Sequence, residues 1–491
     1  MPVVRSRARV AYVALTLTFA ALLGLPHLSM PPGREGAALE VAARALRSGH
    51  PVELPTSTTP GALALALGGT FLSSMPGLGA RVLSLIFVLA LGVVAPRAFS
   101  RRAVPLEATA ASVLAASWFS HAFFDFSSSG RGEIPAHLAL LSAVALAGSA
   151  PQARQGEGAR HWILAHLGPV VLFTAAATIS PRTALLLPLL AHVVSARQGR
   201  RRGAAVAGAA VVALVATFGA LRGRLGTAGV ASAFATERSA PLAGGLATLL
   251  THFRPTAGVL SCVALLALVR WFDRPAGDDQ ASHDRAALLA YALGTSALCS
   301  VSWSGGVSGL EAMIGPFATM AGAAADRAAS PGPRWRWLPL GTVLLALLGL
   351  VASTSNPATK SKGNRATGQY VKRVRDGALA LLGGGSKAAY LATFSVESAD
   401  FFADESSEVG EWLRANGEAG DALLVRGYEP QIYLHAGMSP GAPGDLSRPP
   451  RWIVAPRAQE GLEPRGHATD GYHLRTIFPH FLIFDRARPT Q

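Results

Sequence analysis

Long apolar runs, separated by short breaks that carry arginine, fill the sequence up to about residue 353. Only 15% of the residues in the chain are charged, against roughly 25% in an ordinary soluble protein. A lipid bilayer offers no water to the peptide backbone, so segments of this kind cross it as helices whose backbone groups are satisfied internally. The pattern therefore predicts a mainly α, polytopic membrane protein.

The apolar runs predict about eleven transmembrane helices. The first run follows Arg5, Arg7 and Arg9 and resembles a signal peptide, but no small-residue cleavage site follows it cleanly, so we interpret it as a retained helix. Several runs are shorter than the roughly 20 residues of a straight span, so their ends are approximate. The predicted spans are 10–25, 82–95, 104–119, 134–149, 162–179, 184–196, 203–221, 258–269, 286–303, 310–325 and 337–353.

Basic residues are distributed unequally between the two sets of alternating connections. The set that includes the N-terminus carries 18 Lys and Arg, whereas the other, longer connections carry 10. Cytoplasmic connections are the ones enriched in Lys and Arg, so the N-terminus is predicted inside and the C-terminal part outside the cytoplasm. We divide the chain into a membrane domain, 1–353, and a small extracytoplasmic α/β domain, 354–491, at a bacterial-type inner membrane.

The first outer connection, 26–81, is long enough to be a functional element. Its apolar run 61–74 is kept out of the count of spans, because counting it would place Arg97, Arg101 and Arg102 outside. We therefore predict that this run is a helix lying at the outer membrane surface.

A second surface helix is predicted at 36–48, where the sequence is amphipathic. Arginines on the polar side of such a helix suit an anionic lipid interface, and packing against neighbouring spans is the alternative. The apolar face consists of Leu39, Ala42, Ala43 and Leu46, and the polar face of Glu40, Arg44 and Arg47.

After residue 353 the composition becomes that of a soluble domain, with a basic linker at 360–375. A helix is predicted with its N-cap at Ser406 or Ser407 and its end at Gly417. Its buried face is expected to carry Val409, Trp412 and Leu413. Short buried strands are predicted at 422–425, 452–455 and 481–484, and a short helix between Pro430 and Gly437.

Two acidic residues stand out by their position. Glu35 lies about ten residues beyond the first predicted span, and Glu133 lies at the outer mouth of the fourth. A carboxylate there can deprotonate an acceptor hydroxyl, or hold a divalent cation beside a phosphate leaving group. The alternative is that both are solvated or capping carboxylates.

Three stretches resemble the GT-C superfamily of polytopic glycosyltransferases, which use polyprenyl-phosphate sugars. REGAALEVAARALRSGHPVELPTSTTPG and the apolar residues after it are similar to the start of these enzymes, and GRGEIPAHLALLSAVAL to their second acidic segment. VGEWLRANGEAGDALLVRGYEPQIYLHAGMSPGAP resembles the outer domain of bacterial members, including those likened to dolichyl-phosphate-mannose protein mannosyltransferases. The first loop of the family usually offers an Asp or an Asp-Glu pair, whereas here Arg34 precedes Glu35.

The resemblance implies that Glu35 is the general base and that Glu133 orients the acceptor or a metal. Some branches of the family need a divalent cation such as Mg or Mn and others do not, so a metal held by Glu35 and Glu133 stays open. The guanidinium fork matches phosphate oxygens, although anchoring to lipid headgroups is the commoner use of such arginines. The candidate substrate-binding residues are Arg44, Arg131, Arg222, Arg224, Arg254, His50 and Asp125, the last a rival to Glu133.

The leading hypothesis is a membrane glycosyltransferase that moves a sugar from a polyprenyl-phosphate carrier to a hydroxyl of a glycan, lipid or protein. A flippase for lipid-linked glycans would need buried charges along a path and internal symmetry, and a catalytically degenerate scaffold is the other alternative. The net charge of +15 does not indicate nucleic acid, because the basic residues sit at helix ends and not along one face. Cys262 and Cys299 lie inside apolar runs and offer neither metal spacing nor a disulfide framework.

Overall fold

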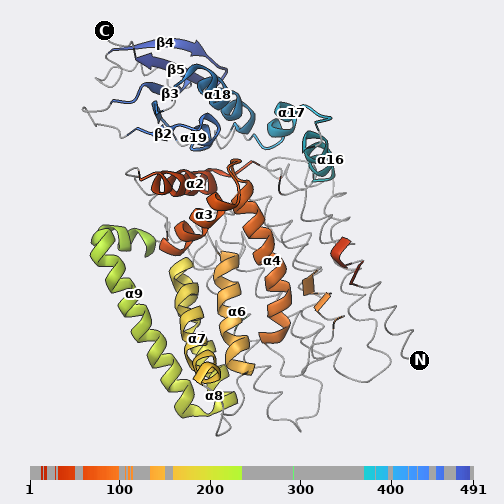
Figure 1. Cartoon of the computed structure of the whole chain (residues 1–491), viewed down its shortest axis with the longest axis vertical. Helices are drawn as coiled ribbons and strands as arrows, with labels where there is room; N and C mark the ends of the chain where they lie inside the picture. Colours follow the sequence, from red (N-terminus) through yellow and green to blue (C-terminus); the bar gives the residue numbers. More distant parts are fainter. Residues whose placement is uncertain are drawn as a thin grey trace, which may run out of the picture.

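The protein is mostly helical with one small sheet, and Figure 1 shows a helical bundle below a sheet-containing domain. The computed structural model describes most of the N-terminal half and most of the C-terminal domain. The described ranges are 31–49, 59–98, 133–149, 159–234, 370–381, 383–395, 402–418, 420–427, 429–441, 449–457 and 471–486, with isolated residues elsewhere.

Five of the described helices pack into a bundle with a continuous apolar core. Large fully buried side chains in this core include Leu140, Leu190 and Phe173. Arg197, in the last turn of α8, donates to the carbonyl of Ala98, the last residue of α4, at 3.3 Å and so satisfies a helix-end acceptor. The bundle consists of α4 (Leu78–Ala98), α6 (Glu133–Ser149), α7 (Ala159–Ile179), α8 (Leu187–Gln198) and α9 (Arg200–Phe234).

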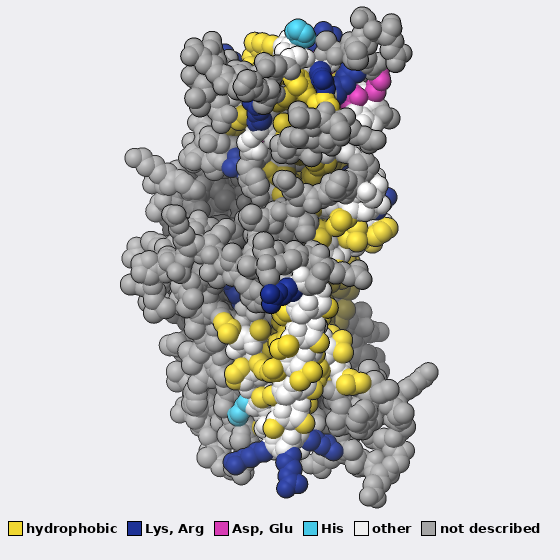
Figure 2. Space-filling model, turned by 90° about the vertical axis from the view of Figure 1, so that its left-hand side faces the viewer, with side chains coloured by type: hydrophobic (Ala, Val, Ile, Leu, Met, Phe, Trp, Pro, Cys, Tyr) yellow, Lys and Arg dark blue, Asp and Glu magenta, His cyan; other side chains and the backbone are white. Residues whose placement is uncertain are grey.

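Two helices among the described residues are long and apolar enough to cross a membrane: Leu78–Ala98 and Arg200–Arg222. Only 11% of the most apolar stretch of the second helix is buried, and its residues Val212 and Val215 are each 68% exposed. Figure 2 shows hydrophobic side chains along this face and Lys and Arg side chains at the lower tip, where α9 begins. An apolar surface with charges at its end fits contact with lipid.

The predicted spans 82–95, 134–149, 162–179 and 203–221 are all helical, as expected. The run 184–196 divides into a 3-10 helix, η2 (Pro181–Leu186), and the shorter α8, and each has a proline in its first turn. The total of eleven spans stays a prediction, because six of them lie largely or wholly outside the described residues: 10–25, 104–119, 258–269, 286–303, 310–325 and 337–353.

Above the bundle lie the two predicted surface helices, α2 (Arg34–Arg47) and α3 (Pro60–Leu72) (Figure 1). The 13 residues of α3 give a length of about 20 Å, shorter than the roughly 30 Å of a bilayer core, as a surface helix requires. Thr59 caps α3 by accepting from the Ala62 amide at 3.2 Å, and it donates to the Ile179 carbonyl at 2.6 Å. This hydroxyl fixes α3 to the end of α7.

The predicted faces of α2 are confirmed in part. Leu39, Ala42 and Ala43 of the predicted apolar face are buried, whereas Leu46 is 46% exposed. On the predicted polar face Arg47 is exposed, but Glu40 is only 5% exposed. The helix packs against α3 and against α19 (Gln431–Ala436), and its contact with lipid stays a prediction.

One expectation about α9 is wrong. The outer connection predicted to start at Arg222 begins as helix, because α9 continues to Phe234 through an Ala- and Gly-rich stretch without proline.

The C-terminal sheet, with the helices packed on it, is called the sheet domain below (402–486). Its strand order is β2-β1-β3-β5-β4, with β1 parallel to β2 and β3, and β5 antiparallel to β3 and β4. The strands are β1 (Ala422–Val425), β2 (Ser439–Pro440), β3 (Trp452–Pro456), β4 (Tyr472–Ile477) and β5 (Phe481–Arg486). The helices are α18 (Ala403–Asn416) and α19 (Gln431–Ala436), preceded by α16 (Tyr370–Leu381) and α17 (Lys387–Ala392).

The predicted strands and the buried face of α18 are confirmed, since Val409 and Leu413 are fully buried and Trp412 packs on the same core. The predicted N-cap is wrong. The helix begins at Ala403, three residues earlier than Ser406, and the Ala403 amide donates to the Ser395 hydroxyl at 2.9 Å. The end of the basic linker is helical too, because α16 starts at Tyr370.

Candidate functional site

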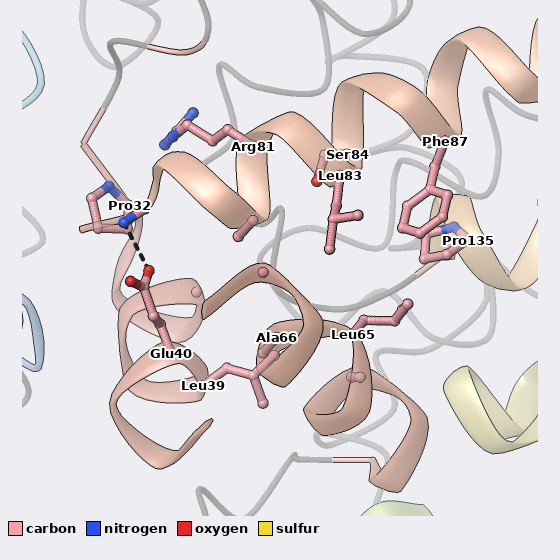
Figure 3. Close-up of a pocket in the computed structure, with 15 residues that line it drawn as sticks. Pro32, Leu39, Glu40, Leu65, Ala66, Arg81, Leu83, Ser84, Phe87 and Pro135 are labelled. Atoms are coloured by element: carbon pink, nitrogen blue, oxygen red, sulfur yellow. Dashed lines mark hydrogen bonds between the residues drawn. The ribbon is translucent and has the colours of Figure 1, made fainter. Parts of the chain in front are cut away.

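A small cavity lies where α2, α3, α4 and α6 meet, at the end of the bundle nearest the sheet domain (Figures 1 and 3). Gly36 of α2 lines one side of this cavity, and Pro135 of α6 lines another. Glu35 directly precedes Gly36, and Glu133 is the first residue of α6, two positions before Pro135. Helix segments carrying the two candidate acids thus border one cavity, although the side chains of Glu35 and Glu133 lie outside the described part of the structure.

The cavity has a volume of about 60 Å³ and a largely apolar wall. Figure 3 shows Leu39 and Leu65 on one side and Phe87 beside Pro135 on the other. On this measure a water molecule needs about 10–15 Å³, so the space is enough for only a few of them. A sugar would therefore have to lie at the rim of the cavity and not inside it.

Glu40 is a buried carboxylate at this cavity, and it accepts hydrogen bonds from three N–H donors. One oxygen accepts from the Gly77 amide at 2.8 Å, and the other accepts from Arg44 Nε at 3.0 Å and Nη2 at 2.7 Å. Arg44 also donates to the Ser74 carbonyl at 2.7 Å. The carboxylate therefore connects α2 to the turn between α3 and α4, and its Glu-x-x-x-Arg spacing was the signal in the sequence that could have revealed the pair.

Arg81, near the start of α4, reinforces the same junction. Its side chain is 4% exposed and donates to the Pro31 carbonyl, just before α2 begins. Close packing of α3 on α4 completes the junction, because a Cβ on Gly79 would overlap the Gly69 carbonyl oxygen. The hydrogen bond from Arg81 to the Pro31 carbonyl thus ties the start of α2, where Glu35 lies, to α4.

A second cleft, of about 380 Å³, lies between the C-terminal half of α2 and the sheet domain. Arg44 and Arg47 line it together with several hydroxyl-bearing side chains. Arg47 donates to the Thr70 carbonyl at 2.6 Å and stacks over the Phe71 ring at 5.2 Å. The remaining polar lining residues are Ser48, Thr70, Ser73, Ser74, Tyr433 and Ser439.

Tyr433 faces this cleft from α19 and is held by its own domain. Its hydroxyl accepts from the Val425 amide at 2.8 Å, and burial raises the pKa of the Tyr433 phenol above its ordinary value. The hydroxyl therefore stays protonated at neutral pH and keeps a hydrogen to donate. Arg44 lies nine residues from Glu35, which corresponds to about 14 Å along the helix, so this cleft is separate from the small cavity.

An ion pair joins α2 directly to the sheet domain. Arg34 Nη2 lies 2.6 Å from Glu429 Oε1, and Glu429 is 5% exposed. The Gln431 amide donates to the other oxygen of Glu429 at 2.5 Å. Sequence reasoning could not have found this pair, because its members are 395 positions apart and neither belongs to a local pattern.

The other predicted site residues are placed as follows. Arg222 is exposed on α9, and Arg224 lies on the same helix with its side chain outside the described part. His50, Asp125, Arg131 and Arg254 lie outside the described residues. The described side chains contain no group of three or more His, Cys, Asp or Glu, and a metal held by Glu35 and Glu133 stays a prediction.

No family model matches the sequence, and no curated protein matches it either. Among solved structures, the chain is similar to the crystal structure of the Archaeoglobus fulgidus oligosaccharyltransferase, determined with zinc and sulfate. The identity is 12% and the TM-score 0.42, over 94% of this chain and 71% of that one. At this level the likeness assigns nothing by itself, so the residues of the site have to carry any assignment.

Proposed function

We propose that this protein is a membrane glycosyltransferase that takes a sugar from a polyprenyl-phosphate carrier at the outer face of a bacterial-type inner membrane. The observation that carries the proposal is the cavity bordered by Gly36 and Pro135, next to the two candidate acids. It lies at the same end of the molecule as α2, α3 and the sheet domain, opposite the arginines at the start of α9 (Figures 1 and 2). This arrangement agrees with the orientation predicted from the basic residues.

In this proposal Glu35 removes the proton from an acceptor hydroxyl, whose oxygen attacks the anomeric carbon of the donor. The bond from that carbon to the phosphate oxygen breaks, and polyprenyl phosphate leaves. General base catalysis of this kind contributes roughly 10²- to 10⁴-fold in rate. Glu133 orients the acceptor, or holds a divalent cation such as Mg or Mn that stabilises the charge developing on the phosphate.

The surroundings suit the prenyl chain of the donor and the far part of the acceptor. Leu39, Leu65 and Phe87 offer an apolar wall to a prenyl chain, and the exposed valines of α9 mark a surface that accepts lipid. Arg44 and Arg47 lie in the adjoining cleft, where the far part of a glycan, lipid or protein acceptor would fit between α2 and the sheet domain. The guanidinium of Arg47, which donates to a backbone carbonyl, suits a phosphate or carboxylate group on that acceptor, whereas that of Arg44 is already paired with Glu40.

A flippase for lipid-linked glycans is favoured less by the described helices. A transport path needs polar groups through the middle of the bundle, and the described core of α4, α6, α7 and α8 is mostly apolar, with His137, which bonds Tyr291 at 2.8 Å, and the buried Nε2 of His192 among its polar groups. The buried arginines that the structure describes in the bundle, Arg81 and Arg197, lie near helix ends. A degenerate scaffold would keep the same fold without activity.

The test uses membranes containing the full chain and a panel of radiolabelled polyprenyl-phosphate hexoses. Glu35→Gln and Glu133→Gln should each lower release of polyprenyl phosphate by about 100-fold or more while insertion stays intact. Glu408→Gln, which changes an exposed residue on α18, is the matched control and should behave as the unaltered chain. Full activity of the Glu35→Gln protein would remove the assignment, and donor movement across the bilayer without cleavage would favour the flippase.

A further inference from the structure

The ion pair between Arg34 and Glu429 is a connection between the sheet domain and the residue next to Glu35. Arg34 is the first residue of α2, and its guanidinium reaches Glu429 at 2.6 Å. The N-cap of the helix, Gly33, makes no side-chain capping bond. Contacts made from outside the helix, such as the one with Glu429, therefore help to fix the position of this turn.

Glu429 is held firmly on the side of the sheet domain. It precedes Pro430, the N-cap of α19, and accepts from the Gln431 amide at 2.5 Å. Gln431 is 2% exposed and lies 3.5 Å from the Ser406 hydroxyl of α18. The carboxylate is thus fixed to two helices of its domain, and it presents its second oxygen to Arg34.

The bundle holds the same turn from the opposite side. Arg81 donates to the Pro31 carbonyl, and Glu40 accepts from the Gly77 amide at 2.8 Å. The segment that carries Glu35 is therefore clamped between α4 and the sheet domain. Release of either clamp would allow this turn to move relative to α6.

We infer that Glu429 is a positioning residue: through Arg34 it places Glu35 against the acceptor, and sugar transfer requires the sheet domain to be docked on α2. The inference rests on the proposed function, because it assigns Glu429 a role in the same site. A misplacement of about 1 Å in a catalytic group can cost roughly 100-fold in rate. A buried carboxylate left without its partner is costly, so the pair keeps the domain docked.

The pairing also bears on a rival use of Arg34 as a phosphate ligand of the donor. A guanidinium already paired with a buried carboxylate carries little net charge toward a second anion. If Arg34 nevertheless bound the donor, its loss would raise the KM for the donor, whereas a loss of positioning lowers kcat. The two roles therefore differ in a measurable way.

The experiment is a double-mutant cycle with Arg34→Gln, Glu429→Gln and the double variant, assayed with a radiolabelled polyprenyl-phosphate hexose that the unaltered chain cleaves. Each single variant should lower kcat roughly 10- to 100-fold and leave the donor KM within about twofold. The double variant should be no worse than either single one, because both remove the same contact.

Lys387→Gln with Glu411→Gln is the matched control, since this pair in the same part of the chain is also 2.6 Å long but exposed at both ends. Hydrogen exchange supplies a readout without activity: amides of residues 33–37 should exchange faster in Glu429→Gln and not in the control. Unchanged kcat in Glu429→Gln, additive effects in the cycle, or a raised donor KM in Arg34→Gln alone would overturn the inference. The proposed function is tested separately: it fails if the unaltered chain moves the donor without cleaving it, or if Glu35→Gln stays fully active.

Discussion

The helical bundle and the sheet domain bury charge in different ways. In the bundle, buried cations donate to backbone carbonyls at helix ends, as Arg197 does to Ala98. In the sheet domain, a buried acid accepts from a side chain and a backbone amide, as Glu405 does from His480 Nδ1 and from the His480 amide, each at 2.6 Å. Buried acids and cations meet at α2, where Glu40 accepts from the Gly77 amide and from Arg44. The boundary between the two regions therefore concentrates fixed charge, which is what a site for charged substrates needs.

The largest effect on stability is expected at this boundary. Glu40→Ala leaves Arg44 without its carboxylate partner and the buried Gly77 amide without an acceptor, so the free energy of unfolding should fall by about 3–5 kcal/mol. Thermal unfolding in detergent measures the loss. Glu408→Gln, at an exposed position, is the control. An unchanged midpoint would mean that α2 is not anchored through Glu40.

A pair of leucines sharpens the comparison between the two regions. Leu140 in the bundle and Leu413 in α18 are both fully buried. Leu413→Ala should cost about 2–5 kcal/mol, because it loses transfer from water and leaves a cavity. Leu140→Ala should cost roughly half as much in a lipid-like environment, where only packing is lost. Equal losses in unfolding experiments would argue against lipid around the bundle.

Acid should destabilise the sheet domain. Burial, with Lys387 nearby, lowers the pKa of His435 from 6.5 to about 4, and Glu411 only partly opposes this shift. Because the folded state resists protonation, the stability is present above pH 6.5 and is lost as the pH falls toward 4. The loss should reach roughly 2–3 kcal/mol. A His435→Gln variant, followed by unfolding against pH, should show a flatter profile.

The smallest effect is expected for an ion pair away from the boundary. Lys387 and Glu411 are 60% and 56% exposed, so solvent screens their attraction. Lys387→Gln should therefore change the free energy of unfolding by less than about 1 kcal/mol. Denaturant titration gives the value. A loss as large as that of Glu40→Ala would contradict the view that the boundary pairs are special.

Local patterns in the sequence predicted most of the elements that the structure describes. Long apolar runs predicted α4, α6, α7 and the first part of α9, and short apolar runs predicted β1, β3 and β5. Strand β2, with only two residues, carries no pattern of its own, and β4 is mostly exposed. Pro181 and Pro188 each start a new helical segment, so the single apolar run predicted at 184–196 is divided between η2 and α8.

The candidate site was predictable only in part. The positions of Glu35 and Glu133 follow from the order of the helices, and the structure puts their helices at one cavity. Glu40 was misjudged because an amphipathic pattern does not say which neighbour covers the polar face. The pair of Arg34 and Glu429 depends on docking between distant segments, which no spacing in the sequence encodes.

Glycine at position 79 has a consequence for engineering. Because its α-carbon lies against the carbonyl of Gly69, a single methyl group there would act as a wedge between α3 and α4. Gly69, Ala80 and Arg81 line the small cavity, so this wedge would displace one of its walls. One added carbon would thus alter the space beside the two proposed acids without changing either of them.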